Sequence, residues 1–178
     1  MTPHHDDRRS FLRWATNGLG AIFAAIIGVP AAFYLADPRN RRAPPSDLRA
    51  VDGVRLSEVG QTPLQGVLRD VRVDAWTLHP NDVIGRVWVV RDPHDRERVR
   101  VFTTICPHLG CSVNLDAACF RCPCHNASFE LNGERILPNP ALRGMDELEW
   151  QPDPADSDRI LVRYQNFEAG TAEKKVIG

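Results

Sequence analysis

Length, composition and charge set the first limits on this chain. Its 178 residues and mass of 20.0 kDa suit one globular domain with an appendage, and they exclude a multidomain enzyme. Hydrophobic residues make up 43% and charged residues 25%, which excludes wholesale disorder and a membrane protein with many spans. The formal net charge of -1 gives no electrostatic reason to expect nucleic acid as a partner.

Residues 14–36 predict a transmembrane anchor. They contain no charged residue, and a helix of this length, rising about 1.5 Å per residue, crosses a hydrocarbon layer of about 30 Å. A buried core helix is one alternative. Cleavage after the apolar stretch is another, but no clear small-x-small site occurs near its end, so we expect an uncleaved anchor.

Residues 1–13 predict a cytoplasmic signal region. Arg8 and Arg9 are followed by Ser-Phe-Leu-Arg, which resembles the twin-arginine export signal. That signal directs folded, cofactor-loaded proteins across the membrane. The resemblance implies a single-pass protein of a bacterial cytoplasmic membrane, with its head domain on the periplasmic, outer face.

Residues 37–50 predict a flexible linker, because they are polar, contain prolines and lack apolar periodicity. Residues 51–178 are then expected to form a tethered head domain. The 14 prolines and 12 glycines of the chain favour a turn-rich, mostly β head.

Short alternating or β-branched runs in the head predict antiparallel strands. They cover residues 67–75, 84–90, 99–105 and 160–164. Asp92-Pro93-His94-Asp95 and Asn132-Gly133 are turn signals of the kind found in hairpins. The tryptophans expected in the core are Trp76, Trp88 and Trp150. Residues 165–178 show no clear pattern, and we assign them no role.

Two short segments carry the chemistry of the chain. All five cysteines lie between Cys106 and Cys124, which is unlike the spread of cysteines in a disulfide scaffold. The segments read Cys106-Pro107-His108-Leu109-Gly110-Cys111 and Cys122-Pro123-Cys124-His125. Each offers a thiolate and an imidazole, so the pair can supply the four ligands of a 2Fe-2S cluster. With two imidazoles on one iron, the reduction potential rises and electron uptake becomes linked to proton uptake.

Two other metal sites are conceivable for these residues. A Cys2His2 zinc site would use the same four donors, but their spacing is not that of a zinc finger, and zinc leaves Cys111 and Cys124 unexplained. Cys119 makes an all-cysteine cluster conceivable; we interpret it as a free or buried thiol. The remaining histidines are interpreted as ordinary surface residues, namely His4, His5, His79 and His94.

The two segments closely resemble those of the Rieske iron-sulfur protein family, which carry Cys-x-His-x-Leu-Gly-Cys and Cys-Pro-Cys-His. The resemblance implies an antiparallel Rieske-type β-sandwich head with a small cluster-binding subdomain and one 2Fe-2S cluster. It implies that Cys106 and Cys122 bind one iron, whereas His108 and His125 bind the other.

The resemblance extends to the surroundings of the cluster. It implies a disulfide between Cys111 and Cys124, which suits the oxidising side of a membrane. The run from Leu137 to Pro140 is similar to the proline loop that shields the cluster, with Pro138 and Pro140 as its prolines. Gly110 is expected to permit a close backbone approach.

One departure from the family bears on the potential. Respiratory members usually continue the second segment with Gly-Ser-x-Tyr, whose hydroxyls donate hydrogen bonds to cluster sulfurs. The equivalent run here is Asn126-Ala127-Ser128-Phe129. Loss of both hydroxyls predicts a lower potential, matched to menaquinol rather than ubiquinol. Ser128 would restore one bond if the loop were shifted.

The resemblance implies the Rieske subunit of a cytochrome bc-type quinol:cytochrome c oxidoreductase. Its expected partners are quinol, cytochrome b and a c-type cytochrome, and the isolated chain is expected to be an electron carrier. His125 and His108 are the candidate residues for quinol contact, with His125 preferred. The alternative function is the small subunit of a molybdenum oxidase such as arsenite oxidase. The export signal and the extra cysteine pair disfavour a soluble Rieske ferredoxin or oxygenase component.

Overall fold

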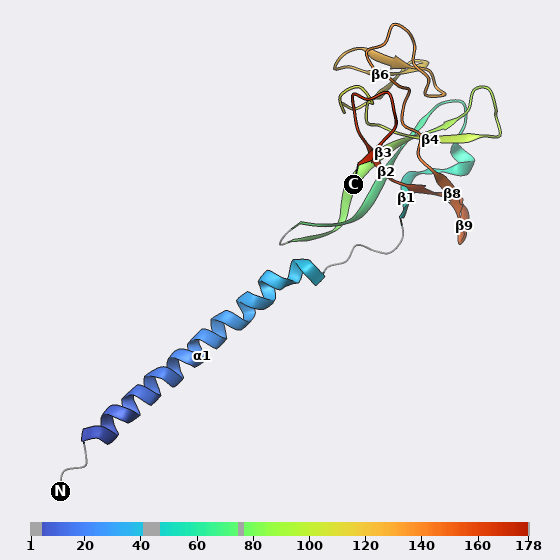
Figure 1. Cartoon of the computed structure of the whole chain (residues 1–178). Helices are drawn as coiled ribbons and strands as arrows, with labels where there is room; N and C mark the ends of the chain where they lie inside the picture. Colours follow the sequence, from blue (N-terminus) through green and yellow to red (C-terminus); the bar gives the residue numbers. More distant parts are fainter. Residues whose placement is uncertain (1–4, 41–46, 75–76, 178) are drawn as a thin grey trace. The chain divides into compact units, whose positions relative to one another are not determined.

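The structure is a computed structural model that describes residues 5–40, 47–74 and 77–177. These residues form an N-terminal helix, α1, and a β-rich head that comprises β1 to β11 (Figure 1). Residues 41–46 of the predicted linker and Trp76 lie outside the described residues. The predicted mostly β, antiparallel fold is confirmed.

Helix α1, His5–Asn40, is longer than the predicted anchor at both ends. Within its stretch Asp7–Ala36, the most apolar window has a mean hydropathy of 2.1, and none of that window is buried within the described structure. By length and composition it can cross a membrane. The helix also includes residues 37–40, which the sequence assigned to the linker.

Six strands form the main sheet, in the order β4-β3-β2-β1-β9-β8. They are β1 Leu48–Arg55, β2 Leu64–Val73, β3 Leu78–Arg91, β4 Val99–Thr103, β8 Trp150–Asp153 and β9 Asp156–Arg163. β1 begins inside the range predicted as linker, because its pairing with β9 starts at Leu48. A short 3-10 helix, η1 Leu56–Glu58, follows β1.

Strand β3 contributes to two hydrophobic cores. Val87 and Val89 belong to the core of the main sheet, whereas Trp88 and Val90 belong to a second core beneath the smaller sheet. Alternate side chains of a strand point to opposite faces, so the fully apolar run 87–90 is buried on both sides. The run therefore joins the main sheet to the part of the head that carries the cysteines.

Two of the predicted core tryptophans are described, and they differ in burial. Trp88 is buried, and its Nε1–H donates to the Val113 carbonyl at 3.0 Å. Trp150 is half-buried against the main-sheet core, and its Nε1–H donates to the Val99 carbonyl at 2.9 Å. The core position is confirmed for Trp88, whereas Trp150 lies at the margin of the core.

A three-stranded sheet forms the smaller part of the head, above β3 and β4 in Figure 1. Its strands are β5 Asn114–Asp116, β6 Cys119–Cys122 and β7 Ala127–Phe129. Phe120 and Phe129 face each other in register and are fully buried. Each buried aromatic side chain contributes about 2–3 kcal/mol of transfer free energy, so this pair holds the small sheet on its core.

Both predicted turns occur. The carboxylate of Asp92 accepts hydrogen bonds from the backbone N–H groups of His94 and Asp95 at 2.8 and 3.4 Å, between β3 and β4. These bonds, the His94 bond first, lower the pKa of Asp92. Gly133 has φ of +86° and donates to Glu130 O at 2.9 Å. A last hairpin, β10 Asn166–Phe167 and β11 Val176–Ile177, lies in the tail that the sequence left without a role.

Candidate metal centre

The first cysteine-histidine segment is a tight turn after β4. The Gly110 N–H donates to Cys106 O at 2.9 Å, and the Cys106 N–H donates to Cys111 O at 2.7 Å. Gly110 has φ of +81°, a conformation that residues with a side chain rarely adopt. The turn itself therefore requires glycine at this position.

The second segment is the turn between β6 and β7. Cys122 ends β6 and pairs with Ala127, the first residue of β7. Asn126 has φ of +57°, a left-handed conformation that asparagine tolerates better than most residues. Cys124 and His125 consequently lie at the exposed tip of a short hairpin.

A disulfide between Cys111 and Cys124 joins the two turns. The structure confirms the pairing that the family resemblance implied. A covalent link between two loops restricts the unfolded chain and keeps the two turns together in the folded one.

The four sequence-predicted donors lie in these joined turns. Cys106 and Cys122 are free thiols with exposed fractions of 0% and 2%. His108 is half-buried and His125 is exposed. The two imidazole centroids are 4.9 Å apart, and their planes are at 87°. The sulfur donors are therefore inside the head, and the nitrogen donors lie toward its surface.

The Cys106 thiol is set up for metal binding rather than for ionisation alone. Burial raises its pKa to about 11, and the Cys122 thiol beside it also raises it. Backbone N–H groups of His108 and Leu109 act in the opposite direction by donating to the Cys106 sulfur. Such a thiol stays protonated at neutral pH until a bound cation compensates the thiolate, and metal binding then releases the proton. The donor set fits a group with sulfur and nitrogen ligands.

The other cysteines do not favour a different centre. The sulfurs of Cys111, Cys122 and Cys124 lie within 4.8 Å of one another, but two of them form the disulfide and offer no thiolate. Cys119 is three residues from Cys122 on β6, so the two side chains point to opposite faces of the strand. Its Sγ instead contacts Asp116 O at 3.5 Å.

The run that is similar to a proline loop is held by Asn139. The Asn139 side-chain amide donates to the carbonyls of Ser128, in β7, and Ile136, and its Oδ1 accepts from the Ala141 N–H at 2.9 Å. Leu137 is 71% exposed. The loop is thus tied to the hairpin that carries Cys122 and His125, a role for Asn139 that sequence reasoning did not identify.

The strand after the second turn settles which side chains face inward. Ala127 and Phe129 are fully buried, whereas Ser128 lies on the opposite face of β7 and is half-buried. Ala127 is paired with Cys122, so the inward positions next to this cysteine carry no hydroxyl. The alternating burial does not favour the shifted loop in which Ser128 would replace a lost hydrogen bond.

An antiparallel β head with two buried thiols, two adjacent imidazoles and a disulfide between the turns defines an iron-sulfur electron-transfer protein. Comparison with protein-family models identifies the kind of iron-sulfur domain. Residues 65–149 match the family model of the Rieske [2Fe-2S] domain, so this region is of the Rieske type, and its two thiols and two imidazoles fit a [2Fe-2S] cofactor. The match favours this cofactor over zinc.

A curated relative supports the same assignment. The chain is 28% identical over 132 residues to the cytochrome b6-f complex iron-sulfur subunit of Chlorobaculum thiosulfatiphilum. The alignment covers 73% of this chain and 62% of that subunit, so the chain spans less than two thirds of its relative. The protein is therefore related to the Rieske subunits of cytochrome bc complexes.

Solved structures of Rieske proteins are also similar to the chain. The plasma membrane Rieske protein PetC3 of Synechocystis PCC 6803 is 26% identical, with 54% of this chain and 84% of that chain covered and a TM-score of 0.37. A chain of a hyperthermophilic respiratory Complex III is 19% identical, with 82% and 98% covered and a TM-score of 0.41.

Proposed function

We propose that the protein is the membrane-anchored Rieske subunit of a quinol:cytochrome c oxidoreductase. In this proposal residues 14–36 anchor the chain in a bacterial cytoplasmic membrane, and residues 1–13 carry a twin-arginine signal. Residues 37–50 link the anchor to a periplasmic head, residues 51–178. The apolar helix α1 and the relatedness to a cytochrome b6-f subunit support this arrangement.

In the proposed centre, Cys106 and Cys122 hold one iron, and His108 and His125 hold the other. When bound, the [2Fe-2S] group supplies a one-electron acceptor whose potential nitrogen ligation raises. The disulfide keeps the two turns together, and the exposed prolines Pro138 and Pro140 belong to the loop that we expect to shield the group.

The exposure of His125 is the observation that carries the proposal. Its imidazole lies edge to face with the half-buried His108, while both thiols are buried behind them. In this proposal, the ring nitrogen of His125 that does not bind metal accepts a hydrogen bond from a quinol hydroxyl and then its proton. Leu109, 60% exposed and adjacent to His108 in the turn, offers an apolar contact to the partner that holds the quinol.

The proposed reaction moves one electron and one proton from quinol at a time. His125 would accept the proton of the quinol, and the bound [2Fe-2S] group would supply the one-electron exchange with the quinol and with a c-type cytochrome. We propose menaquinol as the donor, because Ala127 and Phe129 lack the hydroxyls that raise the potential in other respiratory members.

Electron paramagnetic resonance of the reduced full chain tests the proposed ligands. We expect a rhombic spectrum with a low average g, which indicates nitrogen ligation. His108→Ala and His125→Ala should each abolish this signal. His94→Ala, at an exposed turn between β3 and β4, is the matched control and should retain it. A signal unchanged by either ligand substitution would contradict the proposed centre.

Co-purification from a detergent extract of the membranes tests the proposed partners. Co-purification with a b-type cytochrome is the expected result. Co-purification with a large molybdopterin subunit would instead support the small subunit of a molybdenum oxidase and overturn the proposed partners.

A further inference from the structure

The C-terminal tail forms a closed hairpin whose loop lies against the first ligand turn. Phe167 of β10 is 7% exposed in the main-sheet core, and the Glu168 N–H donates to Lys175 O at 2.9 Å beyond the paired strands. The loop of residues 168–175 is therefore held at its base by both packing and backbone pairing. We call these residues the strap.

The strap contacts the backbone between two of the proposed ligands. The Gly170 N–H donates to Pro107 O at 2.9 Å, and Pro107 is buried between Cys106 and His108 in the chain. Gly170 has φ of +76°, which presents its N–H to this carbonyl in a conformation that favours glycine.

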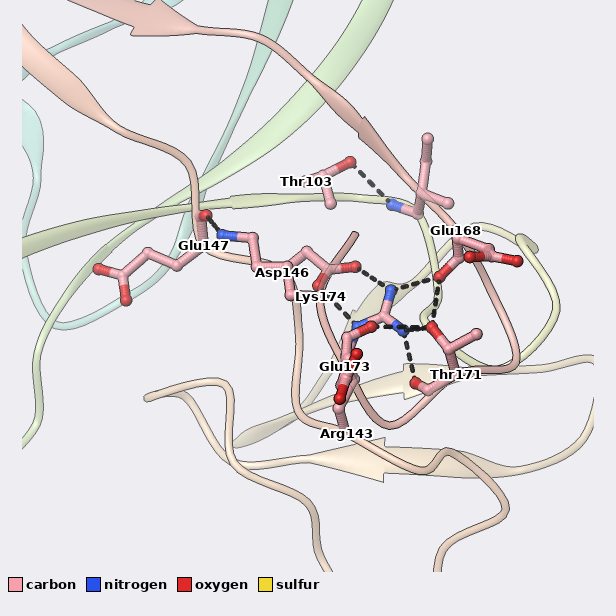
Figure 2. A network of polar contacts seen from close by, with 9 residues as sticks. Thr103, Arg143, Asp146, Glu147, Glu168, Thr171, Glu173 and Lys174 are labelled. Carbon is pink, nitrogen blue, oxygen red and sulfur yellow. Dashed lines mark hydrogen bonds and ion pairs between the residues drawn. The ribbon is translucent and has the colours of Figure 1, made fainter. Parts of the chain in front are cut away.

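Arg143 ties the strap to the rest of the head. Its Nε and Nη2 donate to the two carboxylate oxygens of Asp146, both at 2.8 Å. Its Nη1 also donates to Thr171 O and Oγ1 at 2.6 and 3.0 Å, and its Nη2 donates to Glu168 O at 2.8 Å. Figure 2 shows the guanidinium between the Asp146 carboxylate and the backbone of the strap.

The ion pair between Arg143 and Asp146 is buried and is connected to the main sheet. The side chains of Arg143 and Asp146 are 9% and 4% exposed. The Asp146 carbonyl accepts a hydrogen bond from the Thr103 N–H at 3.0 Å, at the end of β4, three residues before Cys106. The backbone of Asp146, whose side chain forms the ion pair, is therefore hydrogen-bonded to β4, the strand that leads into the first ligand turn.

We propose that Arg143 is a positioning residue, which anchors the strap so that the strap holds the Cys106 to His108 backbone in place. This inference rests on the proposed ligand set. It explains how a short turn keeps the N–H groups of His108 and Leu109 directed at the Cys106 sulfur. Such N–H donors stabilise negative charge on a ligating sulfur and raise the reduction potential.

The test uses the full-length holoprotein in detergent and two readouts, backbone hydrogen exchange and redox titration. The main variant combines Arg143→Gln with Asp146→Asn, so that no buried charge is left without its partner. Thr171→Val leaves the ion pair intact but removes one acceptor of Arg143, together with the hydroxyl's own hydrogen bonds to Glu168 O and Glu173 O within the strap. Arg163→Gln is the control, since it breaks an exposed Arg–Glu pair of 2.9 Å with Glu149.

In the double variant, we expect amides of the strap and of residues 106–111 to exchange about tenfold faster, in keeping with the loss of a net stabilising hydrogen bond or more. The reduction potential should fall, and Thr171→Val should shift both readouts in the same direction by less. The single variant Arg143→Lys, with Asp146 unchanged, should give exchange rates and a reduction potential between those of the double variant and the wild type. Lysine keeps the charge of Arg143 but not its planar fork. The Arg163→Gln control should match the wild type.

Two results would overturn the proposal. If strap exchange is unchanged in the double variant, Arg143 is not its anchor. If the strap exchanges faster while residues 106–111 and the potential stay unchanged, the strap does not hold the ligand turn. A wild-type protein without a Rieske spectrum would count against the proposed ligands instead, and the exchange of residues 106–111 would still decide the role of the strap.

Discussion

Ala127 and Phe129 show how single side chains set the chemistry of this centre. Both are fully buried on one face of β7, where Ala127 pairs with Cys122 and Phe129 pairs with Phe120. Their equivalents in respiratory members of the Rieske family usually carry hydroxyls, which favour the reduced, more negative state of the cofactor. An alanine and a phenylalanine at these positions remove that stabilisation without disturbing the packing of the small sheet.

Restoring the hydroxyls should raise the reduction potential. If one new hydrogen bond favours the reduced state by about 1.4 kcal/mol, Ala127→Ser raises the potential by about 59 mV for one electron. Phe129→Tyr should add a comparable rise. Redox titration of the full chain measures both shifts.

Ser128→Ala is the control for this pair, because Ser128 lies on the other face of β7. It should leave the potential unchanged. A fall on Ser128→Ala would show that Ser128 supplies the missing bond. A wild-type potential as high as that of the hydroxyl-bearing members would contradict the predicted low potential.

At the scale of elements, the three loops of the head brace one another. The disulfide joins the first and second turns, Asn139 ties the proline-containing loop to β7, and the strap contacts the first turn through Pro107. The disulfide and the Asn139–Ser128 contact join residues 13 and 11 positions apart, whereas the strap contact brings the C-terminal tail to the first turn. The centre therefore depends on all three loops rather than on its two ligand turns alone.

Removing the Asn139 amide should loosen the loop from Leu137 to Pro140. Asn139→Ala eliminates donors to Ser128 O and Ile136 O and an acceptor for the Ala141 N–H. At about 1 kcal/mol for each net hydrogen bond, we expect a loss of about 2–3 kcal/mol. The measurement is the rate at which the visible absorbance of the cofactor bleaches on heating.

Asn81→Ala, at an exposed position of β3, serves as the matched substitution and should bleach at the wild-type rate. Equal rates for Asn139→Ala and the wild type would mean that this loop does not protect the cofactor.

At the scale of the whole molecule, a helix able to cross a membrane precedes the Rieske-type electron-transfer domain. We propose that residues 37–50 let the head visit two partners, since a tether keeps its local concentration high while permitting motion. Residues 37–40 continue α1 and β1 starts at Leu48, so a variant that leaves both elements intact changes residues 41–46.

Stiffening this segment should slow electron delivery. Replacement of residues 41–46 by an alanine-rich helical sequence should reduce quinol:cytochrome c turnover by about tenfold or more while the paramagnetic resonance signal stays intact. A Gly/Ser segment of equal length is the control and should support normal turnover. Unchanged turnover in the helical variant would remove the moving head from the mechanism.

The sequence was most informative where chemistry restricts it locally. Each cysteine-histidine segment is short and contains both kinds of donor, so Cys106 and His108 could be singled out from their spacing without a structure. The strap was not readable, because β10 and β11 have two residues each and the whole of β8, β9 and β10 separates Arg143 from Thr171 in the sequence. β1 was missed for a related reason: its polar residues resemble a linker until β9 pairs with it.

The outward placement of the imidazoles has a consequence for traffic through the complex. Because Cys106 and Cys122 are buried, His125 is the most exposed of the four predicted donors. In the proposed complex, we expect cytochrome b and the c-type cytochrome to bind over this same exposed edge. Their binding would then be mutually exclusive, so the head would have to leave the first partner before it could reach the second.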